Sequence, residues 1–380
     1  MASVQAPVIP ILERWIAETP GTISLGQGLV SFGPPAVALD AARRFGALPA
    51  DHRYGPNEGI PTLIAALEDK LARENGIIVR PASRLFVTAG GNLAFMTAAF
   101  AVLDAGDEVI LPAPFYFNHE MAIVMAGGVP VSVPTAENYQ LDVDAIAAAV
   151  TPRTRLVVTV SPNNPTGAVY SEATLRRLNQ LCRDRGLFHI HDEAYEYFVY
   201  GGASHFSPAS IAGAADHTIS LFTLSKAYGM ASWRVGYMVF PARLEDAVNK
   251  VQDTLIICAP VVSQHAAVAA IGVGRSYTEA QLTGLDAARQ FAINVLSAAD
   301  VPCDVADSQG AFYHFLRIHS ALDPMTLSER LIREHRVAIL PGSAFGLLGS
   351  CSARVSYGAL DRSTLEEGLK RLARGLQVIG

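Results

Sequence analysis

A lysine and an arginine eight residues apart mark the stretch of this chain whose residue types most clearly suit a chemical reaction. The apolar run 218–224 has the residue types of a buried strand, and Lys226 follows it at once. Ligands of α/β sheets bind at the carboxyl ends of strands, where burial lowers the pKa of an amine and lets it attack a carbonyl carbon to form a Schiff base. The hydroxyls of Thr223 and Ser225 and the guanidinium of Arg234 could together hold a phosphate. For a single Ser-Lys pair a solvated surface turn is the plainer interpretation, so other motifs must decide.

Two further predicted strands end in polar residues. Strand 155–160 runs into Ser-Pro-Asn-Asn-Pro-Thr-Gly, a turn by its composition, which contains Asn164. Strand 187–191 ends at Asp192, and a buried acid is costly unless a cation meets it. Because the carboxyl ends of parallel strands meet at one edge of a sheet, we expect these two side chains to lie beside Lys226.

The elements that must position these residues alternate between short strands and helices, which predicts an α/β fold with a mostly parallel sheet. Strands are expected at 85–88, 107–111, 129–134, 155–160, 187–191, 218–224, 311–318, 337–340 and 354–357. Helices are expected at 11–18, 36–45, 62–75, 92–103, 142–150, 171–185, 241–255, 282–298, 326–333 and 363–376, with another beginning at 259–264. No internal repeat or additional domain is visible in the sequence.

These motifs resemble the class I/II aminotransferases, fold-type I enzymes that depend on pyridoxal 5'-phosphate (PLP). The string Ser161–Gly167 is highly specific to that family, and the stretch 223–234 is similar to its lysine loop, with Thr223 in place of the first serine. The similarity extends from about Ser24 to the end of the chain.

The resemblance implies a fold and a division into domains. The expected large, PLP-binding domain comprises residues 46–285 and contains a mostly parallel seven-stranded sheet. The expected small α+β domain combines residues 1–45 with residues 286–380.

The resemblance also implies a role for each site residue. Lys226 would bind PLP covalently and carry protons, Asp192 would meet the pyridine nitrogen, and Tyr195 would hydrogen-bond the phenolic oxygen; these three are the expected catalytic residues. The further cofactor contacts implied are Gly90, Gly91, Asn92, Tyr116, Asn164, Thr223, Ser225, Arg234 and Tyr54. Independently of the family, two glycines at the start of an apolar helix suit an anion, because the helix N-terminus presents free N–H groups.

The implied substrates are an amino acid and a 2-oxo acid, with Gly28, Asn164 and Arg354 as the substrate contacts. A guanidinium suits the α-carboxylate because it binds in a bidentate manner. In the family the tyrosine that corresponds to Tyr54 reaches the phosphate of a neighbouring subunit, which implies a homodimer with shared active sites. Some relatives selective for acidic substrates carry lysine where this chain has Asn92, and the segment after Gly28 is apolar. We therefore expect a neutral or aromatic donor.

Two alternatives to the aminotransferase remain open from the sequence. One is another PLP enzyme on the same scaffold, such as a carbon–sulfur β-lyase or a biosynthetic synthase. The other is a non-catalytic regulatory homologue, which the presence of all the chemical residues disfavours.

The composition of the 380 residues excludes several other classes of protein. Half of the residues are hydrophobic, which allows a large core, and the net charge of −6 gives no indication of binding to nucleic acid. The four cysteines are widely spaced and His189 and His191 have no third ligand nearby in sequence, so no metal site is expected. No signal peptide or run of membrane-spanning length is visible, and we expect a cytoplasmic protein.

Overall fold

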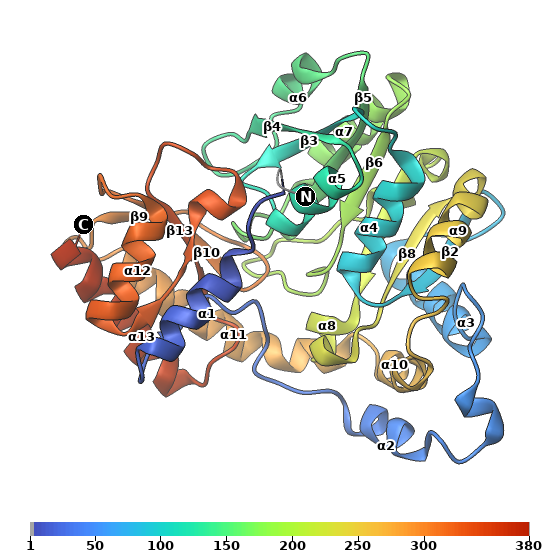
Figure 1. Ribbon diagram of the computed structural model, residues 1–380, viewed down its shortest axis with the longest axis horizontal. Coiled ribbons are helices and arrows are strands. Elements are labelled where there is room, and N and C mark those ends of the chain that lie inside the picture. Colours follow the sequence, from blue (N-terminus) through green and yellow to red (C-terminus); the bar gives the residue numbers. More distant parts are fainter. Residues whose placement is uncertain (1–3, 380) are drawn as a thin grey trace.

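A seven-stranded sheet forms the centre of the larger part of the protein (Figure 1). The computed structural model describes residues 4–379. In spatial order the strands are β2 (Ser83–Thr88), β8 (Gly236–Pro241), β7 (Thr218–Thr223), β6 (Phe188–Asp192), β5 (Thr154–Val160), β3 (Glu108–Ala113) and β4 (Val129–Pro134). All neighbours are parallel except the two pairs that include β8. The mostly parallel seven-stranded sheet expected from the resemblance is confirmed.

Helices cover both faces of this sheet because its strands are apolar on both sides. In β5, Leu156 and Val158 pack into one hydrophobic cluster and Val157 into another on the opposite face. The first face is covered by α4 (Gly91–Val102), α5 (Phe117–Met125) and α9 (Glu245–Leu255). The second is covered by α3 (Pro61–Lys70), α6 (Val143–Ala149), α7 (Glu172–Asp184) and α10 (Val261–Val273), with α2 (Ala36–Arg44) lying on α10.

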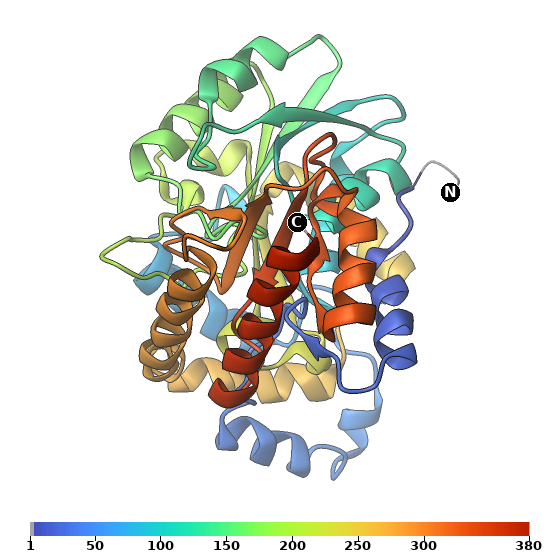
Figure 2. The ribbon, with the colours of Figure 1, turned by 90° about the vertical axis from the view of Figure 1, so that its left-hand side faces the viewer.

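The remaining elements form a smaller α+β layer beside the large sheet (Figure 2). An antiparallel sheet has the order β12 (Leu340–Pro341), β13 (Ser352–Ser356), β10 (Tyr313–Ile318) and β9 (Cys303–Val305), and β1 (Ile23–Ser24) pairs with β11 (Val337–Ala338). The helices here are α1 (Val8–Glu18), α11 (Ser276–Leu296), α12 (Pro324–His335) and α13 (Arg362–Ile379). The domain boundaries at 45/46 and 285/286 stay a prediction.

The carboxyl ends of β5, β6 and β7 lie side by side because these strands are consecutive neighbours in the sheet. Asn164 follows β5, Asp192 ends β6, and the short helix α8 (Leu224–Ala227) follows β7 directly. The predicted gathering of the three polar strand ends is therefore confirmed. His189 and His191 of β6 lie on one face, where both rings contact the Thr159 hydroxyl, at 2.8 and 2.6 Å.

Four predicted elements differ most from the structure. The helix expected at 62–75 is an α-helix only to Lys70 and continues as a π-helix over Leu71–Asn75. The helix expected from 241 begins at Glu245, because Pro241 still belongs to β8. Strand 337–340 divides between two sheets, and α11 begins six residues before the predicted 282. Among residues 4–379, no helix has both the length and the apolar character needed to span a membrane.

Candidate active site

Lys226 lies directly after a strand end, as its sequence position predicts. The Thr223 hydroxyl accepts the Ser225 backbone N–H at 3.1 Å and so caps α8, the helix that carries the lysine into a cavity of about 250 Å³. The lysine Nζ donates to the Gly28 carbonyl at 2.6 Å. Burial, together with two nearby guanidinium groups, lowers the pKa of the Lys226 amine to about 8. A useful fraction of this amine is therefore neutral near neutral pH, as a nucleophile requires.

An anion cradle lies at one end of the cavity, where α4 begins. Gly90 has a φ of +86°, and a Cβ there would lie 2.8 Å from Cζ of Arg234. Gly91 is the first residue of α4, so that the free N–H groups of the helix N-terminus face this point. The Thr223 and Ser225 hydroxyls, 2.8 Å apart, complete the cradle. Hydroxyls, N–H groups and a guanidinium are the donors that a phosphate needs.

Asp192 reaches the cavity from the end of β6. One carboxylate oxygen accepts the Ala194 N–H at 3.0 Å, and the other lies 3.1 Å from His119 Nε2. His119 belongs to α5, and its ring stacks on Phe95 of α4 with 4.0 Å between centroids. The acid is thereby held in one orientation by the backbone and by a fixed imidazole.

Three tyrosines, Tyr116, Tyr195 and Tyr313, line the cavity. The Tyr195 hydroxyl lies 2.8 Å from that of Tyr313, and burial raises the pKa of Tyr195 well above its ordinary value. The Tyr116 hydroxyl accepts from Asn118 at 2.7 Å and donates to Asn92 at 3.3 Å, and burial raises its pKa to about 12. The phenols of Tyr195 and Tyr116 both stay protonated over the physiological pH range. The Tyr116 proton is already donated to Asn92, which leaves Tyr195 as a hydrogen-bond donor towards the cavity.

Arg354 lies on β13, almost completely buried. Its Nη1 donates to Asn164 Oδ1 at 2.8 Å and its Nη2 to the Gly26 carbonyl at 2.6 Å, while the guanidinium stacks 4.3 Å from the Tyr313 ring centre. Its Nε has no hydrogen-bond partner within residues 4–379. A buried, oriented guanidinium with a spare donor is suited to a carboxylate.

The segment around Gly28 crosses the cavity and requires a glycine at that position. A Cβ on Gly28 would lie 2.8 Å from the Tyr313 hydroxyl and 3.8 Å from Nη2 of Arg354. The next residue, Leu29, lines the cavity and is 41% exposed. The apolar side chain of Leu29 therefore faces the site, as the apolar residues after Gly28 indicated.

The structure brings almost all of the predicted site residues together. Those that line the cavity are Gly28, Gly91, Asn92, Tyr116, Asn164, Asp192, Tyr195, Thr223, Ser225, Lys226, Arg234 and Arg354. Gly90 adjoins it as the residue before α4. Tyr54 is different: it is 79% exposed and does not line the cavity of its own chain.

Two residues of the site, His119 and Tyr313, were not predicted from the sequence. His119 follows Tyr116 by three residues, the spacing at which two side chains share one face of a helix, and this could have drawn attention to it. Tyr313 lies in a strand that was predicted from its alternation, but no local signal indicates that its hydroxyl meets Tyr195. Both residues act on the site through partners distant in sequence.

The donor set fits PLP group by group. The amine of lowered pKa suits the aldehyde, the cradle suits the phosphate, and a carboxylate suits a protonated pyridine nitrogen. A protonated phenol suits the phenolic oxygen. The glycine at position 90 leaves open the space that a Cβ would fill against Arg234.

Comparisons with known proteins agree with this geometry. The sequence profile of the family described as aminotransferase class I and II matches residues 20–372. The chain belongs to this family. It is similar to a probable aspartate/prephenate aminotransferase of Aquifex aeolicus, with 35% identity over 367 residues, which are 94% of this chain and 91% of that protein.

Other members of the family show the same similarity. An aromatic aminotransferase of Arabidopsis thaliana is 33% identical over 380 residues, covering 98% of this chain and 94% of that one. The structure of the aspartate aminotransferase from Thermus thermophilus with maleate matches with a TM-score of 0.89 at 31% identity, covering 99% of this chain and 98% of that one. This aminotransferase therefore depends on PLP and exchanges amino groups between amino acids and 2-oxo acids. The β-lyase, synthase and regulatory alternatives are disfavoured.

Proposed function

We propose that this aminotransferase takes neutral or aromatic L-amino acids as donors and works in two half-reactions that share one cavity. The observation that carries the proposal is the set of cations lining the cavity, which within residues 4–379 are Lys226, Arg234 and Arg354. Each of them is needed whichever donor binds: Lys226 forms the Schiff base, Arg234 binds the cofactor phosphate and Arg354 binds the α-carboxylate. None is left for the second carboxylate of an acidic donor. Apolar side chains of Ile9, Leu29 and Phe117 line the cavity instead.

The proposed reaction assigns one task to each group. Bound PLP supplies an electron sink for the negative charge that develops at the substrate α-carbon. Arg354 binds the α-carboxylate and Asn164, which already accepts from Arg354, keeps the guanidinium in place. The Lys226 amine would remove the proton from the substrate α-carbon. Acting then as an acid, it would deliver that proton to the cofactor carbon bonded to the transferred nitrogen. Asp192 keeps the pyridine nitrogen protonated, and Tyr195 donates to the phenolic oxygen.

We also propose a homodimer in which Tyr54 serves the neighbouring subunit. Tyr54 is highly exposed and does not line the cavity of its own chain. It follows the short 3₁₀-helix Pro49–His52, in the segment between α2 and α3 (Figure 1). Leu48, 63% exposed, lies in the same segment. Large exposed apolar side chains of this kind are typical of contact surfaces. A cytoplasmic location is also proposed, supported by four cysteines that are all free.

Steady-state kinetics with pyruvate as acceptor, a 2-oxo acid that has no second carboxylate, test the substrate proposal. The kcat/KM for phenylalanine and leucine should exceed that for aspartate by about tenfold or more, because a second carboxylate would be buried without a cation. The variant Asn92→Lys should reduce that ratio by adding a cation to the cavity lining. A wild-type enzyme that prefers aspartate would contradict the proposal.

A further inference from the structure

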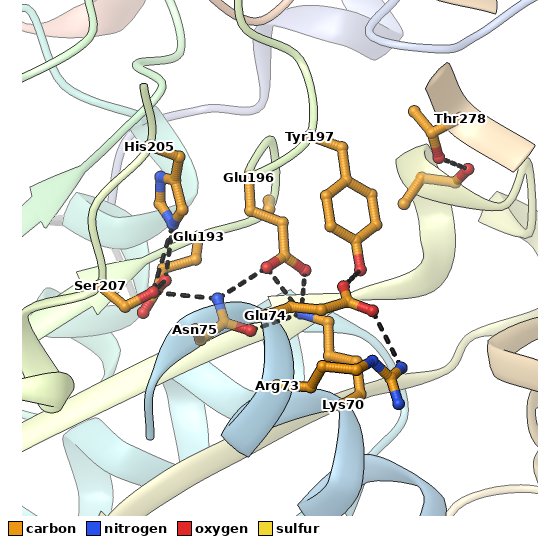
Figure 3. A network of polar contacts seen from close by, with 12 residues as sticks. Lys70, Arg73, Glu74, Asn75, Glu193, Glu196, Tyr197, His205, Ser207 and Thr278 are labelled. Carbon is orange, nitrogen blue, oxygen red and sulfur yellow. Dashed lines mark hydrogen bonds and ion pairs between the residues drawn. The ribbon is translucent and has the colours of Figure 1, made fainter. Parts of the chain in front are cut away.

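The turn after β6 carries site residues on one side and buried acids on the other. Asp192 and Tyr195 line the cavity. Glu193 and Glu196 do not line it, and their carboxylates meet His205 and Lys70 instead (Figure 3). The turn itself is fixed by the backbone: the Glu193 N–H donates to the Leu221 carbonyl at 2.8 Å, and the Glu196 N–H donates to the Glu193 carbonyl at 3.0 Å. Because the turn is fixed in this way, the position of Glu196 restricts the backbone position of its neighbour Tyr195.

Glu196 is held by an ion pair that crosses from the turn to α3. Both of its carboxylate oxygens lie 2.6 Å from Lys70 Nζ, and the side chains of the two residues are only 3% and 10% exposed. Asn75 joins them, accepting from Lys70 at 2.8 Å and donating to Glu196 at 2.8 Å. These three residues, Lys70, Asn75 and Glu196, are called the Lys70 cluster below.

The π-helix Leu71–Asn75 explains how two members of the cluster meet. Lys70 and Asn75 are five residues apart, and the wider turn brings their side chains onto the same side, where α3 faces the turn after β6. Asn75 also donates to Ser207 at 3.0 Å, and Ser207 donates to Glu193. His205 lies 2.8 Å from the same Glu193 carboxylate (Figure 3). The carboxylates of Glu193 and Glu196 are thus both held by polar side chains that do not line the cavity.

Stability alone is a weak explanation for this arrangement. The desolvation of a buried lysine and a buried glutamate offsets most of their attraction, so apolar residues of similar size commonly serve stability as well. What charged hydrogen bonds add is a single geometry, because each partner fixes the direction of the other. That geometry is imposed next to a residue whose hydroxyl must meet one atom of the cofactor.

We propose that the Lys70 cluster positions Tyr195, so that its hydroxyl donates to the phenolic oxygen of bound PLP. The inference rests on the proposed function, which gives Tyr195 that partner. Tyr313 holds the hydroxyl from the cavity side at 2.8 Å, and the Lys70 cluster holds the backbone from the opposite side. The cluster members do not line the cavity, so they act as positioning residues and not as catalytic ones.

The inference has a spectroscopic consequence with a definite sign. A hydroxyl that donates to the phenolic oxygen stabilises the negative charge there, and so favours loss of the proton from the adjacent nitrogen that joins Lys226 to PLP. Correct placement of Tyr195 therefore lowers the pKa of that nitrogen. Displacement of the hydroxyl should raise it, which the pH dependence of the visible absorbance band of bound PLP reports.

The test uses the PLP-loaded variant Lys70→Met/Glu196→Leu, which removes both charges together and leaves no unpaired ion. The midpoint of its absorbance titration should lie about one pH unit above that of the wild type. Its kcat should fall about tenfold while KM for the donor changes little, because Arg354 is untouched. Asn75→Ala is a milder second variant, for which a smaller shift in the same direction is expected.

The control removes another ion pair with a buried carboxylate, that of Glu108 with the exposed Arg153, at the amino end of β3. Glu108→Leu/Arg153→Met should change the melting temperature but not the titration midpoint. An unchanged midpoint in both cluster variants, with a normal wild-type band, would overturn the positioning role alone. A wild-type protein without any PLP band would overturn the proposed function and this inference with it. An equal shift in the control would reduce the effect to general loosening of the fold and would also overturn the positioning role.

Discussion

Lys226 is the residue whose surroundings determine whether the proposed chemistry can occur at physiological pH. Burial is the largest cause of its lowered pKa, the charges of Arg354 and Arg234 add to it, and Asp192 opposes it. A free lysine, with an ordinary pKa of 10.5, would be almost fully protonated at pH 7. Here the neutral, reactive form predominates above a pH of about 8.

The rate at which cofactor-free protein reacts with added PLP should follow this pKa. Below pH 8 the rate should rise about tenfold per pH unit with the neutral fraction, and above it the rate should level off. Stopped-flow absorbance measures the reaction, and Lys226→Ala serves as the control that forms no Schiff base. A rate that still climbs towards pH 10 would show that the amine is solvated.

Arg354 is the second residue whose role can be separated by substitution. Arg354→Ala should raise KM for phenylalanine about 100-fold, because it removes a buried, charge-assisted pair with the α-carboxylate. The amine 2-phenylethylamine lacks that carboxylate, so its slow turnover should hardly change. Steady-state kinetics with both compounds check this, and an equal loss for the two would contradict the assignment.

Among the elements, the segment that crosses the cavity is held against the turn after α8 by very close backbone contact. Gly229 has a φ of +60°, and a Cβ there would lie 2.6 Å from the Gly33 carbonyl oxygen. From the other side, the Tyr277 hydroxyl of α11 donates to the same carbonyl at 2.6 Å. The segment therefore depends on a glycine for its distance from the lysine.

Gly229→Ala should destabilise the protein by about 2 kcal/mol or more and raise KM for the donor. The added Cβ would push the segment away, and the alanine would also have to adopt a strained positive φ. Gly186→Ala is a matched control, because Gly186 has a φ of +66° but nothing within 4 Å of its Cβ position. Denaturant unfolding and steady-state kinetics distinguish the two. If both variants behave alike, the close contact has no part in the effect.

The polar residues at the strand ends could be predicted from the sequence, but their contacts with distant segments could not. Strand ends at Asn164, Asp192 and Lys226 were predictable because apolar runs and turn residues are local signals, and the parallel sheet then places them together. His119 was not predictable as a partner of Asp192, since α5 was not recognised and the contact joins segments about seventy residues apart. The π-helix after Lys70 could not be predicted either, because its buried ion pair with Glu196 depends on tertiary contact.

At the scale of the whole molecule, the proposed dimer makes one specific prediction. Lys226→Ala and Tyr54→Ala each damage a different partner of one shared site, so a mixture refolded together should contain hybrids with one intact site. About a quarter of the wild-type activity should return if subunits mix randomly. If Tyr54 serves its own chain, no hybrid site is intact and the mixture should stay as inactive as its components.

The most direct test of the function is the visible absorbance spectrum of the purified, PLP-loaded protein before and after single amino acids are added without an acceptor. We predict a band of lysine-bound PLP that phenylalanine and leucine convert to the pyridoxamine form, and that returns when a 2-oxo acid is added. The band should be absent from Lys226→Ala after dialysis. A wild-type band that no amino acid changes, or one that only acidic donors convert, would contradict the proposed donor class and cycle.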